Sequence, residues 1–155
     1  MTATLPPRWF VRSAWVAHKA LLRVSADRIG LSRPTPGGKF GMLRLHTVGR
    51  RSGRPRAVLL GYIEDSGRFV TLAMNGWNAA DPAWWHNLQA HPAASVDLAA
   101  ADRREVTAHE ATGAERERLW AALHDYSGYG DLDAHATQRG RETAVVVLTP
   151  AASPQ

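Results

Sequence analysis

Several short segments of the sequence have the composition of β-strands, and most are joined by connections of only a few residues. Short connections favour antiparallel pairing, because parallel neighbours need a long crossover. Asp65-Ser66-Gly67 joins two of these segments and has residues typical of a hairpin turn. We therefore expect an α+β fold that is mainly β, with a largely antiparallel barrel and outer helices. The six expected strands are residues 42–48, 57–65, 68–74, 95–98, 103–110 and 143–149.

Three other segments have helical patterns. Pro7 suits the start of the first helix. Asp81 is expected as the N-cap of the second, with Pro82 in its first turn. Thr112 and Glu115 resemble a capping box at the start of the third. The expected helices span about residues 7–28, 81–90 and 112–125, and residues 126–140 are expected to be irregular.

A chain of 155 residues is long enough for one domain with a real core. We expect an N-terminal helix and linker at 1–41, a barrel domain at 42–149 and a tail at 150–155. The absence of cysteine excludes disulfides and thiolate chemistry. No stretch approaches the ~20 apolar residues of a membrane span, and no cleavable signal pattern is present, so we expect a cytoplasmic protein. The sequence leaves monomer and homodimer open.

The helix expected at 7–28 mixes aromatic and basic residues, among them Trp9, Phe10 and Arg12. An apolar stripe of this kind usually packs on the domain's own core. The alternative is an interfacial helix that rests on the inner face of the cell membrane. We keep peripheral membrane contact as that alternative.

The turn between the first two expected strands carries four arginines within seven residues, Arg50-Arg51-Ser52-Gly53-Arg54-Pro55-Arg56. Guanidinium groups bind phosphate and carboxylate through paired N–H donors. Ser52 and the backbone N–H groups near Gly49 and Gly53 add donors in a nest-like turn. The alternatives are a solvated run of charge or part of a nucleic-acid patch, although such a patch needs a broad basic face. We favour an anion clamp, and we expect no nucleic-acid partner.

The segment from Asp81 to Pro92 contains two adjacent tryptophans, Trp84 and Trp85, which must point in different directions on a helix. One can enter the core while the other lines a cavity, although two core residues would be the more common arrangement. The histidines have no metal-motif spacing, so we expect no metal site. Tyr126 and Tyr129 lie in a glycine-rich segment, where they either pack in the core or cap an aromatic ligand.

Taken together, these segments resemble the deazaflavin-dependent nitroreductase family, the coenzyme F420-dependent enzymes of actinobacteria. The resemblance covers about residues 40–149 and rests mainly on two motifs. These are Leu45–Arg56, with its arginine turn, and Asn75–Pro92, with its Pro-x-Trp-x-x-Asn-Leu core. The family implies a split β-barrel like that of pyridoxamine-phosphate oxidase. It also implies coenzyme F420, which has an apolar tricyclic ring, a phosphodiester and an oligoglutamate tail.

The resemblance also implies roles for individual residues. The arginine turn would hold the phosphate and nearby tail, the second and third strands would line the ring, and the two tyrosines would cover the substrate or donate a proton. The implied cofactor-binding residues are Arg50, Arg51, Ser52, Gly53, Arg56, Val58, Leu59, Leu60, Ala73, Met74, Asn75, Asp81, Pro82 and Trp84, and the implied catalytic residues are Tyr126 and Tyr129.

The sequence departs from the nitroreductase pattern at several positions. Gly61 stands where a tyrosine can occur, and we expect it to enlarge the pocket. Asn75 stands where a lysine often occurs, and Leu132 replaces a further tyrosine. The expected activity is hydride transfer from reduced F420 to a quinone, a nitroaromatic or an activated alkene. The alternatives are an FMN- or haem-binding split barrel and a non-catalytic F420 carrier.

Overall fold

The structure is a computed structural model that describes residues 30–152. The chain divides into two compact units, Met1–Gly30 and Leu31–Gln155, and the fold described below belongs to the second. The helix expected at 7–28 lies outside the described residues, so its contact with a core or a membrane stays a prediction.

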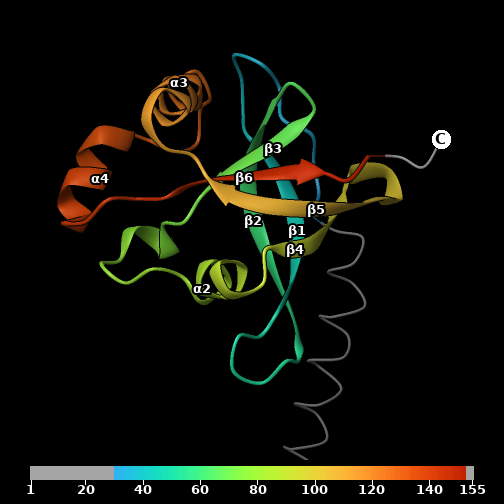
Figure 1. Cartoon of the computed structure of the whole chain (residues 1–155). Coiled ribbons are helices and arrows are strands. Elements are labelled where there is room, and N and C mark those ends of the chain that lie inside the picture. The colour runs from blue at the N-terminus through green and yellow to red at the C-terminus, as the bar shows by residue number, and fades with distance from the viewer. Residues whose placement is uncertain (1–29, 153–155) are drawn as a thin grey trace, which may run out of the picture. The chain divides into compact units, whose positions relative to one another are not determined.

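Six antiparallel strands form a closed barrel in the order β1-β2-β3-β6-β5-β4 (Figure 1). The barrel closes because β1 pairs with β2 on one edge and with β4 on the other. The predicted mainly-β barrel is therefore confirmed, with each expected strand present and small shifts at the ends. The strands are β1 Gly41–Val48, β2 Pro55–Asp65, β3 Arg68–Leu72, β4 Ala93–Leu98, β5 Asp102–Glu110 and β6 Val145–Pro150.

Alternating side chains divide the core into two layers, because successive strand residues point to opposite faces. On β6, Val146 and Leu148 belong to the cluster that fills the barrel. Val145 and Val147 belong to a second cluster, together with Leu119 and other residues of the outer helices. The four consecutive apolar residues of β6 are thus buried on both faces.

The barrel is split along β2. This strand pairs with β1 from Pro55 to Tyr62, but with β3 only at Ile63–Asp65. Thr71 Oγ1 donates a hydrogen bond of 2.8 Å to the Gly61 carbonyl where the two strands separate. The edge of β2 that faces away from β1 therefore has no strand partner over Pro55–Leu60, among residues 30–152.

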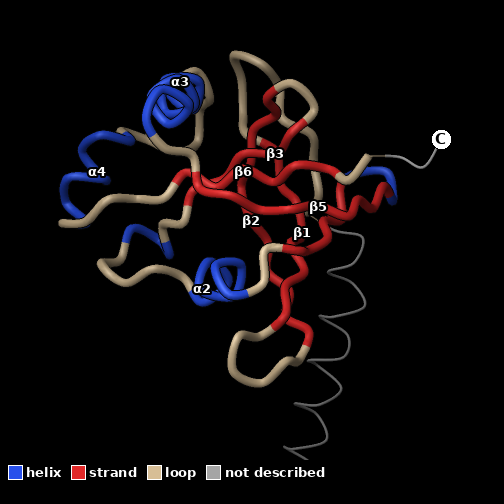
Figure 2. Tube along the Cα trace, in the orientation of Figure 1, coloured by secondary structure: helices blue, strands red, loops and turns tan. Residues whose placement is uncertain are grey.

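Helices α2 (Ala83–Ala90), α3 (Gly113–His124) and α4 (Leu132–Arg139) flank the barrel (Figure 2). Helix α2 buries Trp84, Trp85 and Leu88 against the interior cluster. Helices α3 and α4 cover the second cluster. Within the described part of the chain, no helix is both long and apolar enough to cross a membrane.

Two expectations about the helices are wrong. Thr112 is the N-cap of α3, but its side chain makes no capping bond. Glu115 does not complete a capping box, because its carboxylate is bound to His109 (2.7 Å) and Arg68 (3.2 Å). Segment 126–140, expected to be irregular, contains α4, which starts at a capping Asp131 and ends at a left-handed Gly140.

Asp65 links the β2–β3 hairpin to α3 through its carboxylate. Its carboxylate accepts two hydrogen bonds from Arg118, of 2.7 and 3.1 Å, and one from Arg68. The bonds from Arg118 are the main cause that lowers the pKa of Asp65 to about 2, and those from Arg68 add to them. A lowered pKa stabilises the fold above the unfolded-state pKa, and this stability is lost as the pH falls through the folded-state value.

We therefore expect Asp65→Asn to lower the free energy of unfolding by about 1 kcal/mol at neutral pH, allowing for solvent screening. The difference from wild type should shrink between about pH 4 and pH 2. Urea unfolding across this range measures it. Glu105→Gln is the matched control, because the exposed Glu105 side chain has no partner among residues 30–152. A loss that does not change with pH would contradict the prediction.

Candidate functional site

The arginine turn has a fixed backbone. The Gly49 N–H donates to the Arg54 carbonyl, and the Gly53 N–H donates to the Gly49 carbonyl, each at 2.8 Å. Gly53 has a φ of 67°, a conformation that favours glycine, and a Cβ on Gly49 would lie 2.7 Å from Ser52 Oγ, so a larger residue at Gly49 would displace the Ser52 side chain. Ser52 Oγ accepts the Arg54 N–H at 3.2 Å, which leaves the hydroxyl hydrogen free to donate to an anion.

A buried amide fastens this turn to the barrel. Asn87, on α2, accepts the Arg50 N–H through Oδ1 at 3.0 Å. Its Nδ2 donates to Thr47 Oγ1, near the end of β1, at 3.2 Å. One side chain thus connects a helix, a strand and the turn. Asn87 belongs to the Pro-x-Trp-x-x-Asn-Leu motif, but the sequence alone indicates no such role for Asn87 or Thr47.

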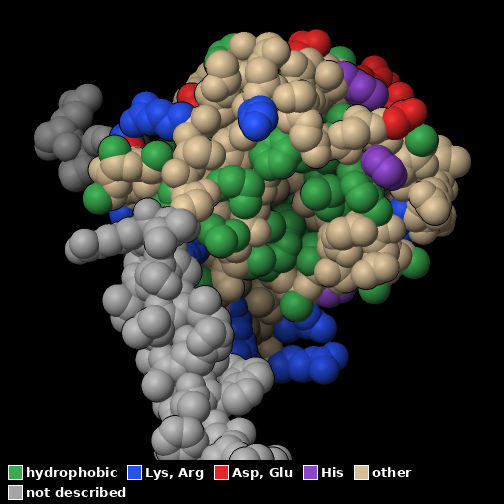
Figure 3. Space-filling model, turned by 180° about the vertical axis from the view of Figure 1, so that it is seen from behind, with side chains coloured by type: hydrophobic (Ala, Val, Ile, Leu, Met, Phe, Trp, Pro, Cys, Tyr) green, Lys and Arg blue, Asp and Glu red, His purple; other side chains and the backbone are tan. Residues whose placement is uncertain are grey.

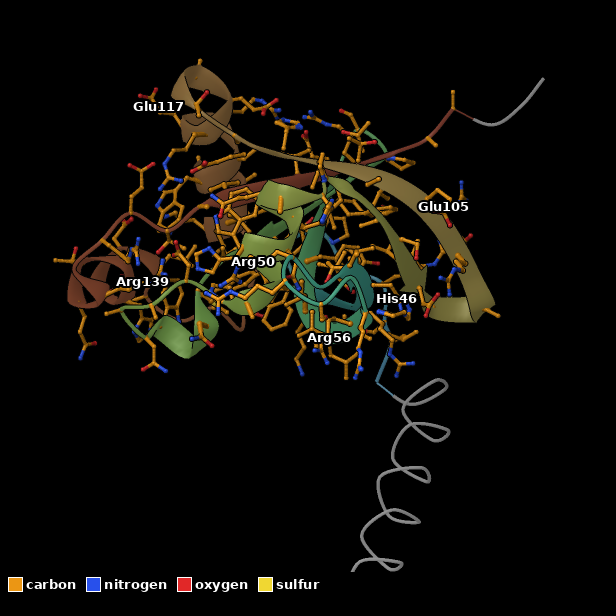
Figure 4. All side chains as sticks on the ribbon, turned by 60° about the horizontal axis from the view of Figure 1, so that its bottom comes forward. His46, Arg50, Arg56, Glu105, Glu117 and Arg139 are labelled. Atoms are coloured by element: carbon orange, nitrogen blue, oxygen red, sulfur yellow. The ribbon has the colours of Figure 1, made fainter. Side chains whose placement is uncertain are left out.

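The four arginines of the turn differ from most other arginines of the described chain in their electrostatic surroundings. Seven arginines elsewhere in the described chain form ion pairs with carboxylates, and these are Arg68, Arg103, Arg104, Arg116, Arg118, Arg139 and Arg141. The side chains of Arg50, Arg51, Arg54 and Arg56 are exposed and bind no described residue. In Figure 4, Arg50 and Arg56 lie well apart from the labelled carboxylates Glu105 and Glu117.

A pocket of about 470 Å³ opens between the turn, the unpaired edge of β2 and the start of α2. Its walls change from cationic at the turn to apolar at Val58, Pro82 and Trp84. Figure 3, which views the molecule from behind, likewise shows apolar side chains gathered above a group of Lys and Arg side chains. The lining residues are Thr47, Gly49, Arg50, Arg51, Ser52, Arg56, Ala57, Val58, Asn75, Pro82, Ala83, Trp84 and Asn87.

The pocket brings together part of the predicted cofactor site. Trp84 lines it, but Trp84 is also buried in the interior cluster with Trp85, and the two rings meet edge to face with their centroids 6.5 Å apart. The predicted cofactor-binding residues that line the pocket are Arg50, Arg51, Ser52, Arg56, Val58, Asn75, Pro82 and Trp84. Those that do not line it are Gly53, Leu59, Leu60, Ala73, Met74 and Asp81.

Asp81 was expected to be the N-cap of α2, and this is wrong. Pro82 holds that position, and no side chain caps the helix. Asp81 instead accepts a hydrogen bond of 2.5 Å from Arg139, whose side chain is fully buried. Arg139 also donates to the Asn78 carbonyl at 2.7 Å, and it thereby anchors the loop that leads into α2. This pairing offsets the negative charge of Asp81 next to the pocket.

The loop between β3 and α2 is strained at the pocket. Asn75, which lines the pocket, and Trp77 both have left-handed backbones, with φ of 44° and 65°. Gly76 between them has a φ of 63°. Left-handed non-glycine residues cost free energy and persist only where the surroundings hold them. The Trp77 ring stacks on His135 of α4 at a centroid distance of 5.4 Å, which supplies part of that support.

The expectation that Gly61 enlarges the pocket is wrong. A Cβ on Gly61 would lie 2.8 Å from two ring carbons of Phe40, because that ring fills the space above the glycine. Phe40 belongs to the segment that was interpreted as a linker, and the sequence analysis gave it no role.

Neither Tyr126 nor Tyr129 lines the pocket. Tyr129 is buried, and its hydroxyl has no hydrogen-bond partner among residues 30–152. Burial is the main cause that raises the pKa of Tyr129. Tyr126 is half-buried at the edge of the second cluster. Their expected roles in capping the substrate and donating a proton stay predictions. No group of side chains within residues 30–152 could hold a metal ion.

Comparison with known proteins places the chain among reductases. The family model described as F420H(2)-dependent quinone reductase matches residues 18–150. An F420H(2)-dependent quinone reductase of Mycobacterium tuberculosis is 30% identical over 148 residues, which cover 92% of this chain and 96% of the relative.

Two solved structures share the fold. One is described as an F420-H2 dependent reductase, with a TM-score of 0.60 and 28% identity over 69% of this chain and 92% of the other. The second is described as a domain-swapped dimer, with a TM-score of 0.64 and 25% identity over 88% of this chain and 98% of the other. The predicted split-barrel fold and the predicted resemblance to F420-dependent enzymes are confirmed.

Asn87 provides a test of how the turn is held. Asn87→Ala leaves the Thr47 hydroxyl and the Arg50 N–H without their partner, so we expect a loss of about 1–3 kcal/mol of stability. We also expect faster hydrogen exchange at the Arg50 amide, measured by NMR. Gln89→Ala, at an exposed position of the same helix, is the matched control. Unchanged exchange at Arg50 would show that the turn is fixed without Asn87.

Proposed function

The chain belongs to the F420H(2)-dependent quinone reductase family, and we propose that it binds reduced F420 in the arginine pocket and reduces a quinone. It is an F420-dependent oxidoreductase. The observation that carries the site assignment is that Arg50, Arg51 and Arg56 line the pocket and have no partner in the described chain. Unpaired cations at the mouth of a pocket favour a polyanionic ligand.

The residues of the turn fit the charged part of this cofactor. Arg50, Arg51 and Arg56 line the pocket and would hold the phosphodiester and the nearby tail. The Ser52 hydroxyl would add a donor. FMN ends in a single phosphate, so the oligoglutamate tail of F420 accounts better for three arginines that line one pocket.

The apolar half of the pocket fits the ring. Val58, Pro82 and Trp84 offer a wall that excludes water. The unpaired edge of β2 exposes backbone N–H and C=O groups, which must find partners once they are removed from water. A heterocycle with polar edges would satisfy them. We place the ring beside Val58–Leu60 and the segment Ala73–Asn75 that follows β3.

When bound, reduced F420 supplies a hydride, and the protein orients the ring and excludes water from the site. The turn and the β2 edge orient the ring, and Trp84 and Pro82 keep water from its face. Holding the acceptor in near-attack geometry would account for most of the rate. The proton that completes quinone reduction would come from the Tyr126 hydroxyl or from a water, because Tyr129 is buried and its pKa is raised.

If the acceptor is a lipid-soluble quinone, contact between residues 7–28 and a membrane would bring the enzyme to its substrate. That contact stays a prediction, which flotation of the full chain with anionic and neutral vesicles tests. One of the similar structures is described as a domain-swapped dimer, and we propose the same arrangement for this chain. Light scattering tests this proposal.

The first test is a fluorescence titration with F420, with FMN run beside it at the same salt concentration. We expect selective F420 binding, and about a tenfold or larger rise in Kd for Arg51→Ala and Arg56→Ala, the loss of one charge-assisted hydrogen bond each. Arg54→Ala is the matched control, because Arg54 is on the same turn but does not line the pocket. Preference for FMN, or equal losses in all three variants, would contradict the assignment.

The two tyrosines can be separated by single hydroxyl deletions. Tyr129→Phe removes a buried hydroxyl without a partner, so stability should stay equal or rise, with turnover unchanged. Tyr126→Phe should lower kcat by about a hundredfold if its hydroxyl donates the proton. Thermal melts and kcat with menadione measure both effects. A large drop in kcat for Tyr129→Phe alone would reverse the assignment.

A further inference from the structure

The ring of Phe40 lies against two glycines that are far apart in the sequence. A Cβ on Gly61 would lie 2.8 Å from two ring carbons, and a Cβ on Gly128 would lie 2.3 Å from another. Real Cβ atoms do not approach a ring this closely. Both glycines therefore leave room for the same aromatic side chain.

Backbone contacts hold the Phe40 ring in this space. The Ser127 N–H donates to the Gly38 carbonyl at 2.7 Å, and the Ser127 hydroxyl donates to the same carbonyl at 3.2 Å. Lys39 and Ser127 form a parallel β-bridge. The Tyr129 ring completes the enclosure, with its centroid 4.5 Å from that of Phe40. The segment before β1 is thus fastened to the tyrosine segment.

Phe40 stands next to the proposed ring site. Gly61 follows Leu60, where the unpaired edge of β2 ends, and it shares one face of β2 with Leu59. Leu59 is 41% exposed, so this face is open beside the glycine. Phe40 and Met74 are both half-buried and pack against the second cluster, and Met74 precedes the pocket residue Asn75.

We propose that Phe40 determines which acceptors fit beside the ring of F420. Its side chain comes from the segment before β1 and fills the space that Gly61 leaves next to β2. This inference rests on the proposed function. Phe40, rather than the residue at 61, then forms the wall that excludes acceptors with larger ring systems. Removal of its ring opens a recess between Gly61 and Gly128 that a fused-ring quinone can enter.

A purely structural role for Phe40 predicts a different result. A ring that only fastens two segments would, when removed, weaken the fold and lower turnover with every acceptor to the same degree. A wall of the acceptor site changes the ratio between large and small acceptors. The ratio therefore separates the two roles.

The experiment compares kcat/KM for a three-ring and a one-ring quinone, with F420H2 as the donor, in three full-length proteins. In Phe40→Ala we expect the ratio of large to small acceptor to rise about tenfold, with the Kd for F420 unchanged. The double variant Phe40→Ala, Gly61→Phe places a phenyl ring in the same space, but attaches it to β2. In this variant the ratio should fall back to the wild-type value. Gly61 tolerates a side chain because its φ is outside the left-handed region, whereas Gly128, with a φ of 108°, does not.

A second measurement needs neither cofactor nor turnover. A new apolar recess binds a small aromatic molecule, and binding raises the melting temperature by mass action. Toluene should raise the Tm of Phe40→Ala and leave the Tm of wild type and the double variant unchanged. Phe40→Leu, which removes less volume, replaces Phe40→Ala in both experiments if the alanine variant does not fold.

An unchanged acceptor ratio in Phe40→Ala, with normal wild-type turnover, overturns this inference alone. A double variant that fails to restore the ratio also overturns it, because the effect would then not depend on volume. A wild-type protein that does not bind F420 overturns the proposed function and this inference with it.

Discussion

The Asn87 side chain is the interaction on which the geometry of the site depends. Four guanidinium groups on one turn repel each other, and the turn projects beyond the last hydrogen-bonded pair of β1 and β2. The amide of Asn87 counters this by holding the Arg50 backbone against α2 and against Thr47. Since Trp84 and Trp85 fix α2 in the end of the barrel, the position of the cations is set by the hydrophobic core. The hydrogen bond between Asn87 and Thr47 is buried and therefore costly to break, because both of its partners would remain without water.

The strands could be predicted from the sequence because their signals are local. Strand-like composition and short connections located all six, and the double-sided burial of β6 follows from its four consecutive apolar residues. Helix α4 was missed although Asp131 and Gly140 are good start and stop signals, because the glycines before it indicated a loop. Asp81 and Glu115 were assigned to helix caps that they do not form, because each meets an arginine from a distant segment. Local rules cannot anticipate such partners.

The same limit applies to the site. The arginine turn, Ser52 and Trp84 were identified from residue type and motif, and the structure gathers them around one pocket. The Asn87 bridge depends on a contact across 37 residues, and the Phe40 ring meets glycines on two separate elements. A glycine in a strand is a visible signal of close approach. Gly61 was interpreted as open space, because the sequence does not show which side chain approaches it.

The unpaired edge of β2 has a consequence for the protein in concentrated solution. An exposed strand edge is a template on which another chain can add a strand, and repeated addition leads to aggregation. Charged residues at such an edge disfavour this pairing, since two like-charged edges repel each other. Arg54 and Arg56 lie at the start of this edge with no described partner to neutralise them. The charge that suits an anionic ligand therefore also disfavours edge-to-edge pairing between copies of the barrel.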